Sequence, residues 1–235
     1  MKQRTGLVLF LLFLLSGLQA QPVQSAIQLK GKIKKEVSGQ YLLYLPKDYR
    51  QSTNDWPLVL FLHGSGERGT DLELVKKHGP PMLVEQGKEF PFILVSPQCP
   101  EGRYWSTEFL DAVLQQVQKK YRVDEDRVYV TGLSMGGYGA WALALEYPDR
   151  FAAIAPVCGG GVAQLLAPIQ DLPAWVFHGE DDDIVPLKES QEMVVAYRKL
   201  GKSVRFTVYP GVKHDSWVQA YNDPELYEWL LEQKR

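Results

Sequence analysis

The sequence has little cysteine, and this scarcity excludes several protein classes. Only Cys99 and Cys158 occur among the 235 residues. Two cysteines cannot form the disulfide framework of a small secreted scaffold, and no CxxC pair indicates a zinc site. We therefore predict neither a metal nor a cofactor.

Excess charge of one sign is also missing. Lys and Arg number 26 against 28 Asp and Glu, for a formal net charge of −2. The one lysine-rich stretch, residues 27–35, largely alternates its lysines with apolar residues, which favours the solvent-facing side of an edge strand. We expect no nucleic-acid partner.

After residue 20, the sequence has no apolar run longer than a typical β-strand. Before this residue, Lys2 and Arg4 precede LVLFLLFLL, which ends at SGLQA. A basic start, a short apolar run and a small-residue end are typical of a secretory signal peptide, and the run is short for a membrane span. We predict a signal peptide over 1–20, cleaved after Ala20 or alternatively Ala26. The single mature domain, 21–235, is then secreted or periplasmic, without a membrane anchor; its oligomeric state is open.

The rest of the chain alternates strand-like and helix-like segments. Segments 26–33 and 40–49 resemble an antiparallel pair. Apolar runs typical of strands buried on both faces cover 57–64, 92–98, 127–134, 151–159, 174–180 and 204–210. Helical patterns cover 108–121, 186–201 and 224–233. This alternation predicts the α/β class, with a mostly parallel sheet covered by helices on both faces. Sites in such sheets form at the carboxyl ends of the strands.

One predicted strand end carries a candidate nucleophile. In VYVTGLSMGGYGAW, residues 128–141, a β-branched run leads into G-x-S-x-G and then into good helix formers. Such a turn exposes the serine hydroxyl above the sheet, and its glycines are needed because side chains there would collide with the strand and helix. We predict Ser134 as the nucleophile.

A serine hydroxyl needs a base to take its proton, and a histidine oriented by a carboxylate does this best. In α/β hydrolases the order along the chain is nucleophile, acid, histidine. His63 and His78 precede Ser134, and His178 directly precedes the acidic cluster. His214, after the last predicted strand, is therefore the expected base.

The acid has to lie between the nucleophile and the base, at a strand end. Glu180, Asp181, Asp182 and Asp183 all satisfy this condition. Reasoning from the residues alone leaves the four equivalent. The cluster also permits a weak calcium site, although one short cluster supplies few well-spaced ligands.

Two backbone N–H groups are expected to stabilise the oxyanion. One belongs to Met135, after the nucleophile, and the other to the loop HGSGERG, residues 63–69. Ser65 is the expected donor of this loop, with Gly66 as second choice. Gly64 lets the backbone approach the substrate closely and is a predicted substrate-binding residue.

With these motifs, the chain resembles the α/β-hydrolase serine esterases. More narrowly, it is similar to the small lidless phospholipase/carboxylesterase group, which includes predicted peptidases and dienelactone-hydrolase-like proteins. The motifs are LFLHGSGERG (60–69), SPQCPEGRYW (96–105), VTGLSMGGYGAW (130–141), YPDRFAAIAPVCGGG (147–161), HGEDDDIVP (178–186) and KHDSWVQAYNDPELYEWL (213–230). The resemblance implies the α/β-hydrolase fold without a lid domain. It also selects Asp182 as the acid, through the HGxxDxxVP pattern, with Asp181 in reserve.

In this fold the strands ending near Cys99 and Cys158 lie three strand steps apart. At about 4.8 Å per step this separation is roughly 14 Å, whereas a disulfide joins Cα atoms at most about 7 Å apart. We predict two free thiols near the rim of the site.

The substrate is less defined than the reaction. Only residues 160–172 separate two predicted strands where a lid usually grows, so we expect an open pocket. Tyr104, Trp105 and Trp217 lie near strand ends and are suited to stack on a sugar or an aryl acid. We predict a serine carboxylesterase for short-chain, aryl or carbohydrate-linked esters; a serine peptidase or a thioesterase remains open.

Two other classes fit the sequence less well. Residues 64–69 match G-x-G-x-x-G after a buried strand, the fingerprint of a dinucleotide-binding oxidoreductase. A dinucleotide-binding site needs an acidic residue at the tip of the next strand, but this sequence has Ser96, Pro97 and Gln98 there. A catalytically inactive binding module conflicts with the presence of all three triad candidates.

Overall fold

The computed structural model describes residues 28–31, 36–169, 171–202 and 204–235. Contacts divide the chain into one unit from Met1 to Glu36 and a second, compact unit from Val37 to Arg235. The predicted signal peptide lies outside the described residues. Within the described ranges, no helix has both the length and the apolar character to cross a membrane.

The first predicted strand is wrong where it can be compared. Residues 28–31 form neither helix nor strand. The only apolar side chain among them, Leu29, is 93% exposed, so burial does not stabilise an extended pairing there. The remainder of the predicted strand over 26–33 lies outside the described residues.

A mixed sheet forms the centre of the second unit. Among the described residues it has seven strands in the order β1-β3-β2-β4-β5-β6-β7. The strands are β1 (Tyr41–Tyr44), β2 (Trp56–Leu62), β3 (Ile93–Pro97), β4 (Val123–Leu133), β5 (Ala153–Val157), β6 (Ala174–Gly179) and β7 (Val204–Tyr209). All pairs are parallel except β1 with β3. The predicted α/β-hydrolase architecture is confirmed.

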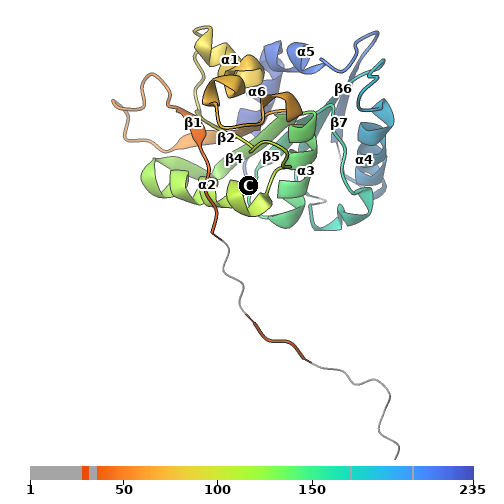
Figure 1. Cartoon of the computed structure of the whole chain (residues 1–235), viewed down its shortest axis with the longest axis horizontal. Helices are drawn as coiled ribbons and strands as arrows, with labels where there is room; N and C mark the ends of the chain where they lie inside the picture. The colour runs from red at the N-terminus through yellow and green to blue at the C-terminus, as the bar shows by residue number, and fades with distance from the viewer. Residues whose placement is uncertain (1–27, 32–35, 170, 203) are drawn as a thin grey trace, which may run out of the picture. The chain divides into compact units, whose positions relative to one another are not determined.

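Helices cover both faces of this sheet. The α-helices are α1 (Gly79–Glu85), α2 (Thr107–Lys120), α3 (Met135–Glu146), α4 (Leu187–Lys199), α5 (Trp217–Asn222) and α6 (Pro224–Glu232). Short 3₁₀ helices are η1 (Ser65–Glu67), η2 (Leu72–Lys77), η3 (Ala163–Leu165) and η4 (Ala167–Ile169). In the view of Figure 1, α1 and α6 lie above the strands and α2 lies below them.

The core has two layers because side chains alternate along each strand. On β2, Leu58, Leu60 and Leu62 pack into the layer that holds the buried residues of α2, α3 and α4. Val59 and Phe61 point into the opposite layer, with buried residues of α1, α5 and α6. The unbroken apolar run at 57–62 follows from this double burial.

The longer helices confirm their predicted patterns. Leu110, Val113, Leu114 and Val117 are the buried face of α2. The residue before α2, Ser106, accepts a hydrogen bond from the Phe109 N–H at 3.3 Å, as an N-cap does.

Two short helices and part of a strand were not predicted. Helix α1 occupies the segment around Pro80 and Pro81 that reads as a connection, because proline is tolerated in the first helical turn. Strand β4 begins at Val123, four residues before the predicted run, since its first residues are less buried. Helix α5 is too short to show an amphipathic repeat.

The strand order also accounts for the cysteines. Strands β2 and β4 separate β3, which precedes Cys99, from β5, which precedes Cys158. Both cysteines are free, as predicted. They are buried, with exposed fractions of 1% and 0%, rather than exposed at a rim, and Cys158 Sγ lies within 4.8 Å of ligand atoms of Asp182 and His214.

Candidate active site

Ser134 occupies the corner between β4 and α3. Its backbone has φ 52° and ψ −117°, a conformation that non-glycine residues rarely adopt. Hydrogen bonds hold both sides of this corner: the Ser134 N–H donates to Val157 O at 3.0 Å, and the Gly137 N–H donates to Ser134 O at 2.8 Å. The neighbouring strand and the new helix therefore fix a strained turn.

The glycines around Ser134 are required by close backbone contacts. A Cβ on Gly132 would lie 2.4 Å from Gly136 O, and one on Gly136 would lie 1.9 Å from Leu62 O. Both clashes are with backbone atoms, which side-chain rotation cannot relieve. Glycine is therefore required at both ends of the G-x-S-x-G turn, for the steric reason expected from the sequence.

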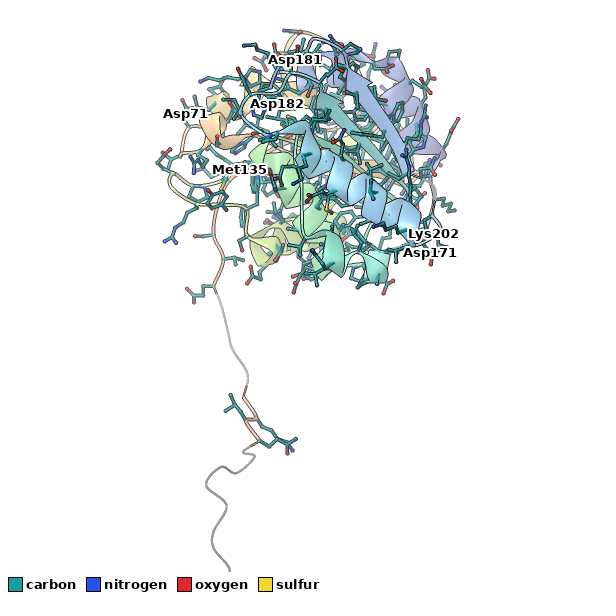
Figure 2. The ribbon with its side chains drawn as sticks, turned by 90° about the vertical axis from the view of Figure 1, so that its right-hand side faces the viewer. Asp71, Met135, Asp171, Asp181, Asp182 and Lys202 are labelled. Atoms are coloured by element: carbon teal, nitrogen blue, oxygen red, sulfur yellow. The ribbon has the colours of Figure 1, made fainter. Side chains whose placement is uncertain are left out.

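Three side chains from separate strand ends meet at this corner. His214, in the loop after β7, has Nε2 2.9 Å from Ser134 Oγ. Its other ring nitrogen, Nδ1, is 2.8 Å from Oδ2 of Asp182, in the loop after β6. In the view of Figure 2, Asp182 and Met135, the residue after Ser134, are labelled in the upper left part of the molecule, whereas Asp171 and Lys202 are at the lower right.

Asp182 differs from its neighbours in burial. Its side chain is fully buried, and its second oxygen, Oδ1, accepts the N–H groups of Ile184 and Val185 at 3.0 and 2.8 Å. Asp181 and Asp183 are exposed, and Asp183 pairs with Lys213 at 3.1 Å. Of the four carboxylates left open by the sequence, Asp182 is the one in contact with His214.

A second imidazole reaches the same carboxylate. His178, the buried residue near the end of β6, has Nε2 3.2 Å from Asp182 Oδ2 and 2.9 Å from Val185 O. Its Nδ1 lies 2.7 Å from Ser190 Oγ. Because Nε2 faces two acceptors, it carries a proton. Burial lowers the pKa of His178, which favours the neutral ring, and the single hydroxyl proton of Ser190 faces both Nδ1 and Gly159 O, the latter at 3.0 Å. Sequence order excluded His178 as the base and gave no signal for this contact.

A second buried histidine, His63, supports the loop after β2. The Cys99 N–H donates to His63 Nε2 at 3.0 Å, so the ring proton is on Nδ1, which donates to Gly64 O at 2.6 Å. Burial lowers the pKa of His63 to about 4 and keeps the ring neutral. The Trp105 indole N–H donates to His63 O at 3.2 Å. These contacts fix the start of the 63–69 loop.

The predicted oxyanion donors are at helix starts. Met135 is the first residue of α3 and Ser65 the first of η1, so their N–H groups have no acceptor within their own helix. Gly64, the residue before Ser65, lies close to the nucleophile, because a Cβ on Gly64 would be 3.7 Å from the Ser134 Cβ. The 63–69 loop therefore runs beside the serine.

The three aromatic side chains differ in their surroundings. Trp217, the first residue of α5, meets the His214 ring edge-on at 5.2 Å between centroids. Trp105 is half-buried against His63, with centroids 4.7 Å apart. Tyr104 is 80% exposed. Trp217 is thus beside the candidate triad, whereas Trp105 packs beneath the loop.

Neither metal nor dinucleotide binding is favoured by this geometry. In the described part of the chain, the one potential metal-ligand group combines Cys158 with Asp182 and His214, with ligand atoms within 4.8 Å of one another. Burial raises the pKa of the Cys158 thiol to about 12, which opposes the thiolate form that metals need. The 64–69 loop forms the short η1, not the start of a long helix that would face a pyrophosphate.

Comparisons with known proteins agree with this architecture. Curated relatives include the bifunctional acetylxylan esterase/xylanase XynS20E of Neocallimastix patriciarum, 26% identical over 149 residues, which are 60% of this chain and 22% of that protein. The "Probable feruloyl esterase C" of Aspergillus terreus is 24% identical over 159 residues, 66% of this chain and 58% of that protein. The match thus spans about a fifth of the first relative and somewhat over half of the second.

A solved structure and a family model extend the match. The crystal structure of a thermostable esterase has a TM-score of 0.71 and 40% identity, covering 83% of this chain and 59% of that one. The Esterase family model, described as "Putative esterase", matches residues 35–206, which include Ser134 and Asp182 and end before His214. The chain therefore belongs to the Esterase family of serine hydrolases with the α/β-hydrolase fold.

Proposed function

We propose that the protein is a secreted serine carboxylesterase in which Ser134, His214 and Asp182 form a catalytic triad. One observation carries the proposal: the continuous contact from Ser134 Oγ through the His214 ring to Asp182, at 2.9 and 2.8 Å. Both distances suit hydrogen bonds, and the order of groups suits proton transfer from the serine.

The reaction proceeds in two halves through an acyl-enzyme. His214 Nε2 takes the Ser134 proton while Oγ bonds to the ester carbonyl carbon, and the imidazolium then protonates the departing alcohol as the ester C–O bond breaks. Water next attacks the acyl group, His214 takes its proton, and the proton returns to Ser134 Oγ as the acid leaves. Asp182 orients the ring and stabilises its charged form.

The N–H groups of Ser65 and Met135 are the proposed oxyanion donors. They are free of helical acceptors, and the rigid loop around His63 holds one of them in place. Preorganised donors of this kind each contribute about 2.7–4 kcal/mol to stabilisation of the transition state.

The proposed substrates are short-chain, aryl or carbohydrate-linked esters. Two of the relatives, a bifunctional acetylxylan esterase/xylanase and a probable feruloyl esterase, support this class. So does Trp217 beside His214, with Trp105 and Gly64 as further proposed substrate-binding residues. In the described part of the chain, the connection from β5 to β6 carries only η3 and η4, which favours an open pocket.

Export is proposed from the sequence of residues 1–20. Its basic start, apolar run and small-residue end fit a cleaved signal peptide. The mature enzyme would then meet its ester substrate outside the cytoplasm.

The test combines one variant with a substrate series. Ser134→Ala should lower kcat/KM for p-nitrophenyl acetate by a factor on the order of 10⁴ or more, with an unchanged melting temperature. Ser38→Ala, at an exposed site, is the matched control. Activity of Ser134→Ala within tenfold of wild type would end the triad assignment.

The substrate series separates the three acyl-transfer activities. p-Nitrophenyl esters of rising chain length, methyl ferulate, acetylated xylan, an acyl thioester and a peptide amide are compared at equal enzyme concentration. The proposal expects short-chain or carbohydrate-linked esters to rank first. A peptide amide or a thioester at the top of the ranking would replace the esterase by a peptidase or a thioesterase.

A further inference from the structure

Glu67 is a buried carboxylate that the proposed triad does not use. It is the last residue of η1, in the loop after β2, and its side chain is 7% exposed. Among the described residues, its nearest cationic group is His78 Nε2, 3.8 Å from Oε1, which is longer than a hydrogen bond. No described donor lies within hydrogen-bond distance of the carboxylate oxygens.

This carboxylate faces the candidate active site. A Cβ placed on Gly64 would lie 3.2 Å from Glu67 Oε2 and 3.7 Å from the Ser134 Cβ. Glu67 and Ser134 therefore both lie beside the Gly64 backbone, together with Leu133, whose Cδ1 would be 2.8 Å from the same Cβ.

Two ring contacts complete the surroundings. The His78 ring is 5.4 Å from Trp217, and the Trp217 ring is 5.2 Å from His214. A line of contacts thus runs from His214 through Trp217 and His78 to Glu67 in the 63–69 loop.

Burial of a carboxylate without a hydrogen-bond donor is costly. Buried polar groups in proteins are almost always hydrogen-bonded, and a charged one loses several kcal/mol without a partner. A carboxylate also opposes the negative charge that develops beside it on the ester oxygen. In the described residues, the Glu67 oxygens are not among the fully buried side-chain atoms without a partner, so they remain accessible to a group that arrives from outside the fold.

We propose that Glu67 and His78 form a subsite for a hydroxyl group on the alcohol part of the ester, as in a monoacetylated sugar. The inference rests on the proposed esterase function and specifies its substrate class. A hydroxyl donates to the carboxylate and accepts from the imidazole, so both residues are satisfied by one group. The substrate also shields Glu67 from the oxyanion.

The position of Glu67 favours a hydroxyl next to the ester bond. A sugar hydroxyl on the carbon beside the acylated one is only a few bonds from the carbonyl carbon, which matches the short span from Ser134 to Glu67. The phenolic hydroxyl of an aryl acid is a whole ring further away.

A cationic substrate suits this place less well. The His78 imidazole already lies against the carboxylate and repels a cation whenever it is protonated. The Trp217 ring contacts His78 and His214, so it offers no open aromatic cage to an ammonium group.

The test compares two acetates of similar size. Methyl xyloside acetylated at one ring hydroxyl carries neighbouring hydroxyls, and cyclohexyl acetate carries none. The ratio of their kcat/KM values should fall about tenfold or more in Glu67→Ala, and by less in Glu67→Gln, whose amide oxygen still accepts. Glu73→Gln, an exposed change on η2, is the matched control and should keep the ratio.

The outcomes separate the alternatives. An equal loss on both acetates, or an unchanged ratio, would overturn the hydroxyl subsite. A loss confined to acetylcholine relative to cyclohexyl acetate would replace it by a cation site. Melting temperatures show whether Glu67→Ala folds, and Glu67→Gln provides the test if it does not.

A binding measurement is independent of the triad. Calorimetry on Ser134→Ala gives the Kd of the acetylated methyl xyloside, and adding Glu67→Ala should weaken it about tenfold. An unchanged Kd would contradict the subsite even if the esterase function holds. If the wild type does not hydrolyse these esters, the esterase function is contradicted. The change in Kd caused by Glu67→Ala then still tests the subsite.

Discussion

His178 and His214 share one carboxylate oxygen, Oδ2 of Asp182, at 3.2 and 2.8 Å. The first ring is fully buried and the second is partly exposed at the site. The His178 Nε2–H donates to Val185 O at 2.9 Å and also lies beside Asp182 Oδ2, where its partial positive charge holds the carboxylate in place and reduces its effect on His214. His178 is therefore a positioning residue of the proposed triad.

Two substitutions of His178 separate its contacts. A glutamine amide reaches the place of Nε2 and keeps an N–H group beside Val185 O and Asp182, whereas an asparagine amide reaches only toward Ser190. His178→Asn should lower kcat/KM about tenfold, and His178→Gln by less. Without the donor, Asp182 stabilises the charged His214 more strongly, so the acid limb of the pH–rate profile moves to higher pH in His178→Asn. Equal profiles in both variants would assign His178 a purely structural role.

The acid is tested with three matched variants. Asp182→Asn should lower kcat by several orders of magnitude, because the amide cannot stabilise a charged His214 and favours the wrong tautomer. Asp181→Asn and Asp183→Asn change exposed neighbours and should stay within about twofold. A loss concentrated at either neighbour would transfer the role to it.

Ser134 is expected to weaken the fold that carries it. Its φ of 52° suits glycine better than serine. Ser134→Gly should therefore raise the free energy of unfolding by about 1 kcal/mol while abolishing esterase activity. Urea unfolding measures the first effect, with Ser134→Ala, which keeps the strain, as control. A glycine variant less stable than the alanine variant would show that the turn is not strained.

Acid should destabilise the protein through His63. Its pKa falls from 6.5 to about 4 on folding, so the unfolded chain binds more protons between these values. The stabilisation is complete above pH 6.5 and decreases as the pH falls toward 4, by about 3 kcal/mol for this residue. Urea unfolding at pH 7.5 and 4.5 should show a smaller difference for His63→Asn than for wild type. Equal differences would mean that His63 is not buried in its neutral form.

Thiol titration checks the strand order. Two thiols should react in unreduced protein unfolded in guanidinium, and neither should react quickly in the native state, because burial raises the pKa of both Cys99 and Cys158. No reactive thiol in the unfolded protein would require a disulfide that spans three strand steps.

Sequence patterns predicted the parts of the fold in which burial leaves a local signature. The run at 57–62 is recognisable because it is apolar without interruption, and the helix at 107–120 because its buried residues recur at helical spacing. Helix α1 was missed because its two prolines resemble a turn. Residues 28–31 were assigned to a strand from alternation alone, and no packing supports it.

The site was predictable in kind but not in every member. The G-x-S-x-G turn indicated Ser134, and the chain order of α/β hydrolases indicated His214. Reasoning from the residues left the four carboxylates at 180–183 open, and only the family resemblance selected Asp182, because the turn after β6 that buries it leaves no local signal. His178 and Glu67 carry no local signal, since their contacts depend on how separate loops meet.

Ser134, Asp182, His214 and the 63–69 loop each follow a different strand, and the sheet itself contributes no reacting group. Insertions in any one of these connections would reshape the pocket while the strand pairing beneath it stays intact. Substrate preference in such a protein can therefore change through one loop at a time, while the sheet keeps its structure.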